Sequence, residues 1–126
     1  MKMNNKQPPL SPHLPIYKWR LTMFASIAHR MSGVFLVLTM PMAFWLLLSM
    51  SHGKIMYAYG LSWLQSSTGT VLLWLMCVAL FYHLINGIRF LLLDIGKTDS
   101  REAMKLSAKI VVFSTIIFAL VLAVKI

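Results

Sequence analysis

Three long apolar runs divide this chain. The first contains residues 31–53, which carry no charged side chain when His52 is counted as neutral. A helix that spans a bilayer needs about 20 predominantly apolar residues, and this run exceeds that length. Two further runs follow. The run at about residues 69–93 is interrupted only by His83, Asn86 and Arg89. The pattern predicts an all-α integral membrane protein with three transmembrane helices, at about residues 21–50, 69–93 and 106–126.

The polar segments around these runs predict the connections. Residues 51–67 read as a loop with a short interfacial helix near residues 55–64, and residues 94–105 as a short polar connection in which Ser100 can cap the next helix. Residues 1–20 are basic and contain four prolines, which disfavour a regular helix. We therefore expect a basic, proline-rich N-terminal arm at residues 1–20 and a three-helix membrane anchor domain at residues 21–126.

Composition and charge support placement in a bilayer. Hydrophobic residues make up 59% of the chain and charged residues 12%, whereas a soluble domain is usually about 45–50% apolar. The formal net charge is +9, but the basic residues flank the apolar runs as membrane anchors do, so we expect a lipid bilayer and no nucleic acid as the partner. With the N-terminus inside, ten of the 12 Lys and Arg residues lie on or near the inner face. The positive-inside rule therefore predicts that the N-terminus is inside.

The first residues indicate the compartment. They contain neither the apolar core of a secretory signal nor the Arg- and Ser-rich amphipathic pattern of a transit peptide. We expect a multi-pass protein of the bacterial inner membrane, or of the mitochondrial inner membrane if the chain is encoded or processed in an organelle.

His83 is the first residue that could carry chemistry. It lies about 16 Å before Asp94 along the predicted second helix, which places it near the middle of the membrane. Asn86, Gly87 and Phe90 follow on the same helix face, and Gly87 would allow a flat group to lie close to the helix. Spacing leaves three roles open for His83: a hydrogen-bonded packing residue, an axial haem ligand or a proton relay.

A similar polar face begins the first predicted helix, at Ser26, His29, Arg30 and Gly33. Arg30 could pair with a carboxylate or donate a hydrogen bond to a carbonyl, and Ser26 could also donate to a carbonyl. The simpler alternative is that His29 and Arg30 anchor the helix to phosphate headgroups. Arg89 points about 120° away from His83, towards the membrane interface, a neighbouring subunit or the edge of a haem.

Two sequence patterns carry a resemblance to a known family. The segment PLSPHLPIY at residues 9–17, followed by S-x-x-H-R-x-S-G at residues 26–33, resembles an N-terminal signature of the cytochrome b subunit of succinate dehydrogenase, the larger of the two membrane anchors of succinate:quinone oxidoreductase. The pattern H-x-x-x-G-I-R-F-x-x-x-D-x-G at residues 83–96 resembles the second signature of that family. Three positions depart from the usual pattern: Pro8, Phe90 and Leu93.

The resemblance implies a cofactor and a role for each matching residue. His83 would be an axial ligand of haem b, shared with the second membrane anchor subunit. Ser26 and Arg30 would border the ubiquinone-binding pocket, and His29 and Arg30 would approach the haem propionates. Phe90 stands where the family often has a histidine, so no propionate contact is expected from that position.

The implied function is electron transfer in the tricarboxylic acid cycle and respiratory chain. A flavoprotein subunit and an iron–sulfur subunit would oxidise succinate and pass electrons to ubiquinone, so this chain is not an enzyme on its own and not a hydrolase. Two alternatives remain at this point. The chain could anchor a fumarate reductase, or it could be a structural anchor that binds no haem.

Overall fold

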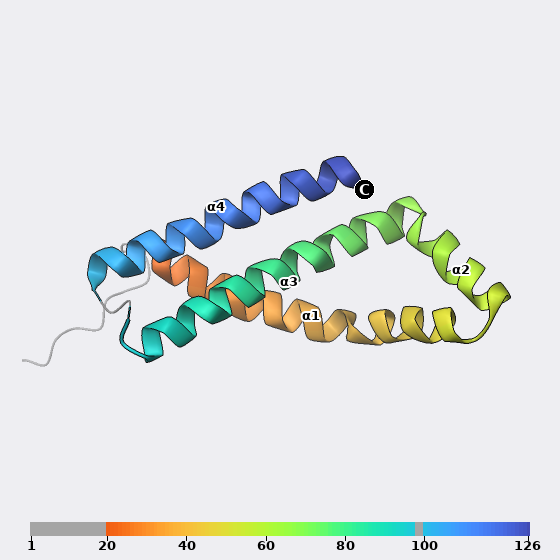
Figure 1. The fold of residues 1–126 in the computed structure, drawn as a ribbon, viewed down its shortest axis with the longest axis horizontal. Helices are drawn as coiled ribbons and strands as arrows, with labels where there is room; N and C mark the ends of the chain where they lie inside the picture. Colours follow the sequence, from red (N-terminus) through yellow and green to blue (C-terminus); the bar gives the residue numbers. More distant parts are fainter. Residues whose placement is uncertain (1–19, 98–99) are drawn as a thin grey trace, which may run out of the picture.

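The computed structural model describes residues 20–97 and 100–126, which form four helices and no strand (Figure 1). Three of them, α1 (Leu21–Ser51), α3 (Ser67–Asp94) and α4 (Arg101–Lys125), are long and apolar enough to span a membrane. The short helix α2 (Lys54–Leu64) connects α1 to α3. These helices confirm the predicted all-α class with three spans. The predicted N-terminal arm lies outside the described residues, except for Arg20, the N-cap residue of α1.

Helix boundaries follow local capping chemistry. Ser66 precedes α3 and its hydroxyl accepts a hydrogen bond from the backbone N–H of Gly69 at 3.1 Å, while Ser100 accepts one from Ala103 at 3.1 Å. A serine at the N-cap satisfies a backbone donor that the helix leaves unpaired. The predicted cap at Ser100 is confirmed. Because of it, α4 begins at Arg101, five residues before the apolar run that predicted the third span.

The end of α3 explains one glycine of the second sequence pattern. Gly96 adopts a φ of 76°, its N–H donates to the Leu93 carbonyl, and the N–H of Lys97 donates to the Leu92 carbonyl. These paired bonds form a Schellman motif, which requires the left-handed conformation that glycine adopts at low cost. Gly96 therefore ends α3 just after Asp94.

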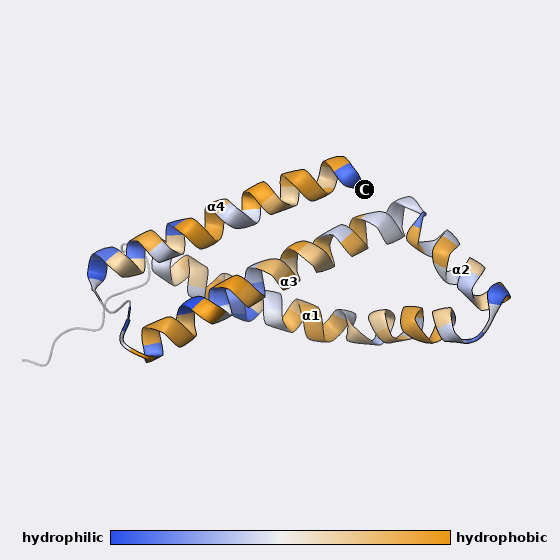
Figure 2. Cartoon of the chain, in the orientation of Figure 1, coloured by the Kyte–Doolittle hydropathy of each residue, from blue (hydrophilic) through white to orange (hydrophobic). Residues whose placement is uncertain are grey.

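The three long helices meet closely at one end of the molecule. Helices α1 and α3 run in opposite directions, and α4 packs beside both (Figure 1). The buried residues of this end come from the start of α1, the end of α3 and the first half of α4: Ala25, Asn86, Arg89, Ala108 and Val111. Blue, hydrophilic residues also gather where α3 ends and α4 begins (Figure 2). The tightest packing thus lies beside the polar ends of the spans.

Helix α2 covers the other end of α1. A Cβ on Gly60 would lie 3.3 Å from the Cβ of Ser49, so the two helices approach closely at this point. Trp45 and Trp63 pack edge to face, with ring centroids 6.1 Å apart. Tyr57 and Tyr59 are exposed, as expected of aromatic residues at a headgroup layer. The predicted short helix between the first two spans is confirmed.

Candidate functional site

Two histidines from different helices form the centre of the site. The imidazole rings of His29 on α1 and His83 on α3 stack with centroids 4.1 Å apart and planes inclined by 10°. Phe90, two turns after His83, packs its edge against His29 at 5.2 Å. The structure therefore brings together the polar faces of the first two predicted spans.

Hydrogen bonds fix the orientation of the His83 ring. Its Nδ1 lies 3.1 Å from the carbonyl oxygen of His29 and 3.1 Å from the hydroxyl oxygen of Ser32. The Ser32 hydroxyl itself donates to the His29 carbonyl at 2.8 Å. Because a carbonyl oxygen only accepts, we assign the proton of a neutral His83 to Nδ1. The lone pair of Nε2 is then left for another partner.

His29 has an incomplete set of hydrogen bonds. Its Nε2 is buried, and among the described residues it has no hydrogen-bond partner. A buried polar atom without a partner carries a free-energy cost of about 1–3 kcal/mol. His29 Nε2 is therefore a polar atom that a further partner would stabilise.

A reciprocal arrangement of glycines allows the two rings to stack. Each histidine is followed by a glycine one turn later, at Gly33 and at Gly87, and each glycine faces the histidine of the other helix. A Cβ on Gly33 would lie 2.9 Å from Cε1 of His83, whereas a Cβ on Gly87 would lie 3.6 Å from Nε2 of His29. The H-x-x-x-G spacing occurs in both sequence patterns, and this repetition is the signal from which the pairing could have been predicted.

A groove of about 490 Å³ opens beside the two histidines. Its lining combines polar residues from the site with apolar side chains of α1: His29, Arg30, Gly33, Val34, Val37, Leu38 and His83. Val34, Val37 and Leu38 are exposed, so another molecule can enter the groove from the surface of the described helices. It offers an imidazole and a guanidinium at the edge of an apolar wall, which suits a large flat ligand that carries acidic groups.

Ser26 and Arg30 lie together on one face of α1. The Nη2 atom of Arg30 donates a long hydrogen bond of 3.5 Å to the hydroxyl of Ser26. Arg30 is exposed and lines the groove, whereas Ser26 lies one turn closer to the start of α1 and is not among the lining residues. Since its oxygen accepts from Arg30, the Ser26 hydroxyl keeps its own proton for a further acceptor.

Arg89 does not occupy the position expected from the sequence. It is 5% exposed and reaches α4, where its Nε donates to the Ser107 hydroxyl at 3.0 Å and its Nη2 to the Met104 carbonyl at 3.4 Å. Its Nη1 donates to the side-chain oxygen of Asn86 at 3.4 Å. The expectation that Arg89 faces the membrane interface, another subunit or a haem edge is wrong, because α4 packs over this face of α3.

Asn86 connects this arginine to α1, and Tyr82 bonds to the same residue of α1. Both donate to the backbone carbonyl of Ala25, Asn86 at 3.0 Å and Tyr82 at 2.8 Å. Asn86 is fully buried. The polar layer, which we define as Ala25, Tyr82, Asn86, Arg89 and Ser107, therefore joins all three spans about one turn from the histidine pair.

The ligand set limits which metal centres fit. Within residues 20–97 and 100–126, no group of three or more His, Cys, Asp or Glu side chains is placed to hold a metal ion. A haem would need only one imidazole from this chain, because the porphyrin itself supplies four nitrogen ligands to the iron. His83 meets the usual condition for such a ligand, since its Nδ1 is held by a backbone carbonyl while no hydrogen bond to Nε2 is made by the residues that the structure describes.

The fold and site define a class: a multi-pass membrane protein with a paired-histidine site between two spans. Residues 4–122 match the succinate dehydrogenase/fumarate reductase transmembrane subunit family, and the chain belongs to that family. This confirms the resemblance that the two sequence patterns predicted.

Individual relatives agree with this assignment. A succinate dehydrogenase cytochrome b556 subunit of Rickettsia felis is 38% identical over 122 residues, covering 94% of this chain and 91% of the relative. A mitochondrial succinate dehydrogenase cytochrome b560 subunit of Mus musculus is 37% identical over 103 residues, covering 76% of this chain and 58% of the relative. Bacterial and mitochondrial relatives both fit the predicted inner-membrane location.

Proposed function

We propose that this chain is the haem b-binding membrane anchor of a succinate:quinone oxidoreductase and forms part of its quinone site. The observation that carries the proposal is the histidine pair, with a free Nε2 on His83 and a buried, unpartnered Nε2 on His29 beside an accessible groove. The relatives are named as succinate dehydrogenase subunits, which favours succinate oxidation over fumarate reduction as the physiological direction.

His83 would bind the haem iron through Nε2, and the second anchor subunit would supply the other protein ligand. His29 and Arg30 would bind the propionates, one through the unpartnered imidazole nitrogen and the other through its guanidinium. A haem b held in this way supplies one-electron redox chemistry within the membrane. The bond from Nδ1 of His83 to the His29 carbonyl holds the ring at a fixed angle and directs Nε2 away from that carbonyl.

Ser26 and Arg30 would bind the ubiquinone. Arg30 donates to a quinone carbonyl oxygen, while the Ser26 hydroxyl accepts from Arg30 and is free to donate its own proton to the same oxygen. Negative charge develops on that oxygen as the quinone is reduced, and a fixed guanidinium stabilises it. Because Arg30 is exposed near the start of α1, protons can arrive from the aqueous side.

The remaining subunits would dock at the end of the molecule where α1 begins. With the N-terminus inside, this end faces the inner aqueous compartment and carries most of the cations. An iron–sulfur subunit and a flavoprotein subunit docked there would oxidise succinate and deliver electrons over a short distance to the site. The chain itself would bind no dicarboxylate.

The quinone site is tested by comparing two activities of the purified complex. Arg30→Ala should lower succinate-dependent quinone reduction by about 10- to 100-fold, since it removes a charge-assisted hydrogen bond to the substrate. Reduction of an artificial acceptor by the soluble subunits should stay unchanged. Lys125→Ala, at the far end of α4, serves as the control and should preserve both activities. Quinone reduction at the wild-type rate in Arg30→Ala would remove Arg30 from the site.

A further inference from the structure

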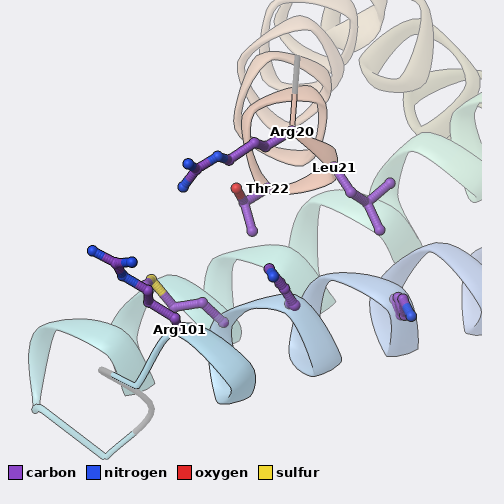
Figure 3. Close-up of a pocket in the computed structure, with 7 residues that line it drawn as sticks. Arg20, Leu21, Thr22 and Arg101 are labelled. Carbon is purple, nitrogen blue, oxygen red and sulfur yellow. The ribbon is translucent and has the colours of Figure 1, made fainter. Parts of the chain in front are cut away.

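A second hollow lies outside the histidine site, between the first turn of α1 and the first half of α4 (Figure 3). It measures about 400 Å³ and is lined by Arg20, Leu21, Thr22, Arg101, Met104, Lys105 and Lys109. Arg20 and Thr22 reach it from α1, and Arg101 reaches it from the start of α4 across from them (Figure 3). None of these residues belongs to the histidine site.

The hollow concentrates positive charge. Arg101, Lys105 and Lys109 follow one another at intervals of four residues, so they share one face of α4, and Arg20 adds a fourth cation from α1. None of the described residues that line the hollow is acidic. Like charges four residues apart on a helix repel each other, and an anion between them would relieve that repulsion.

The start of α1 adds to this field. Its N-cap residue is Arg20, which makes no side-chain capping bond, and its first turn contains no acidic residue. The first N–H groups of a helix and the helix dipole both favour an anion at this end. Two features of the described residues, four cations that line one hollow and a helix N-terminus that Arg20 does not cap with its side chain, therefore favour the same kind of ligand in the same hollow.

The surroundings indicate that the anion belongs to an amphipathic molecule. The hollow lies where the apolar spans begin, and Leu106, Ile110 and Phe113 are exposed along the same helix as its three cations. Basic pockets between transmembrane helices at this level bind lipid headgroups. A ligand with a phosphate in the hollow and acyl chains along α4 would cover both surfaces.

We propose that the hollow between α1 and α4 is a binding site for an anionic phospholipid. The phosphodiester lies between the cations of α4 and Arg20, the Thr22 hydroxyl donates to one of its oxygens, and the acyl chains pack on the exposed apolar side chains of α4. This site is separate from the haem and quinone site and does not depend on its assignment.

The test measures lipid retained by the complex after purification in a mild detergent. The double variant Lys105→Gln/Lys109→Gln should retain phosphatidylglycerol roughly tenfold less than the wild type, because each basic residue near the membrane surface adds to the attraction. The control Lys54→Gln/Lys125→Gln removes the same charge elsewhere and should retain as much as the wild type. Lys105→Arg/Lys109→Arg keeps both charges and should also retain the lipid, which separates loss of charge from misfolding.

Three results would overturn the proposal. The first is equal retention of phosphatidylglycerol by the glutamine double variant and its control. The second is equal stabilisation of delipidated wild-type complex by phosphatidylglycerol and by phosphatidylcholine, or by inorganic phosphate at the same concentration. The third is loss of the soluble subunits from the glutamine double variant while lipid is retained, which would make the hollow a docking surface for an acidic protein.

Discussion

At the scale of single residues, each ring of the histidine pair lies beside a glycine of the facing helix. Gly33 and Gly87 occupy equivalent positions on facing helices, but the space beside them differs. A Cβ at position 33 would press on the His83 ring at 2.9 Å, and that ring is held by its hydrogen bonds to the His29 carbonyl and Ser32. A Cβ at position 87 would make an ordinary contact of 3.6 Å with His29. Substitution of glycine by alanine should therefore lower the stability of the protein at position 33 and not at position 87.

We predict that Gly33→Ala destabilises the protein and Gly87→Ala does not. Overpacking against a constrained ring costs about 1–3 kcal/mol, which exceeds the gain of about 1 kcal/mol that alanine brings to a helix interior. Gly87→Ala should be neutral or stabilising. Thermal unfolding of the purified complex in detergent measures both. Equal transition temperatures for the two variants would show that the His83 ring can move away at little cost.

At the scale of helices, the polar layer holds α1, α3 and α4 together. Arg89 is almost fully buried, and its three hydrogen bonds reach neutral oxygens of Asn86, Ser107 and Met104. Asn86 extends the connection to the Ala25 carbonyl of α1. Polar side chains between spans satisfy each other where lipid offers no partner, so this layer specifies how the helices pack.

We predict that Arg89→Met loosens the packing of α4. It removes three hydrogen bonds and leaves the buried side-chain oxygen of Asn86 without this donor, a loss that costs about 1–3 kcal/mol. Thermal unfolding should show a clear drop, whereas Lys125→Met, which removes an exposed cation at the end of α4, should change stability by less than about 0.5 kcal/mol. Cysteine crosslinking between α3 and α4 provides a second measure of the separation. An unchanged transition temperature in Arg89→Met would mean that the apolar contacts of α4 hold it without the polar layer.

The sequence predicted the helices well and their contacts poorly. Apolar runs located α1, α3 and α4, the interfacial character of the segment between the first two runs located α2, and Ser100 predicted the cap of α4, since all these signals are local. The partner of Arg89 was missed, because helical periodicity gives the direction of a side chain and not the helix that packs on it. The bond between Ser32 and His83 joins residues 51 positions apart, and no local pattern encodes it. The polar faces around His29 and His83 were identified separately, and the structure shows that they meet.

At the scale of the whole molecule, the described spans bury little of their surface. Among the hydrophobic residues that the structure describes, only Ala25, Ala108 and Val111 are buried, while large apolar side chains along α1, α3 and α4 are exposed. A bilayer accommodates such a surface, and a second anchor subunit could cover part of it beside the groove. The histidine pair lies at the border between the packed end and this open surface, which is where a haem shared between two subunits would have to bind.

The most direct test of this account is the haem content of His83→Ala. The reduced-minus-oxidised spectrum of the purified wild-type complex should show a b-type haem, and His83→Ala should lose that signal while the chain is still present in the membrane. His52→Ala removes an exposed histidine after the end of α1 and should keep the full signal. A b-type spectrum of wild-type intensity in His83→Ala, with the protein at normal levels, would contradict the assignment of His83 as the haem ligand.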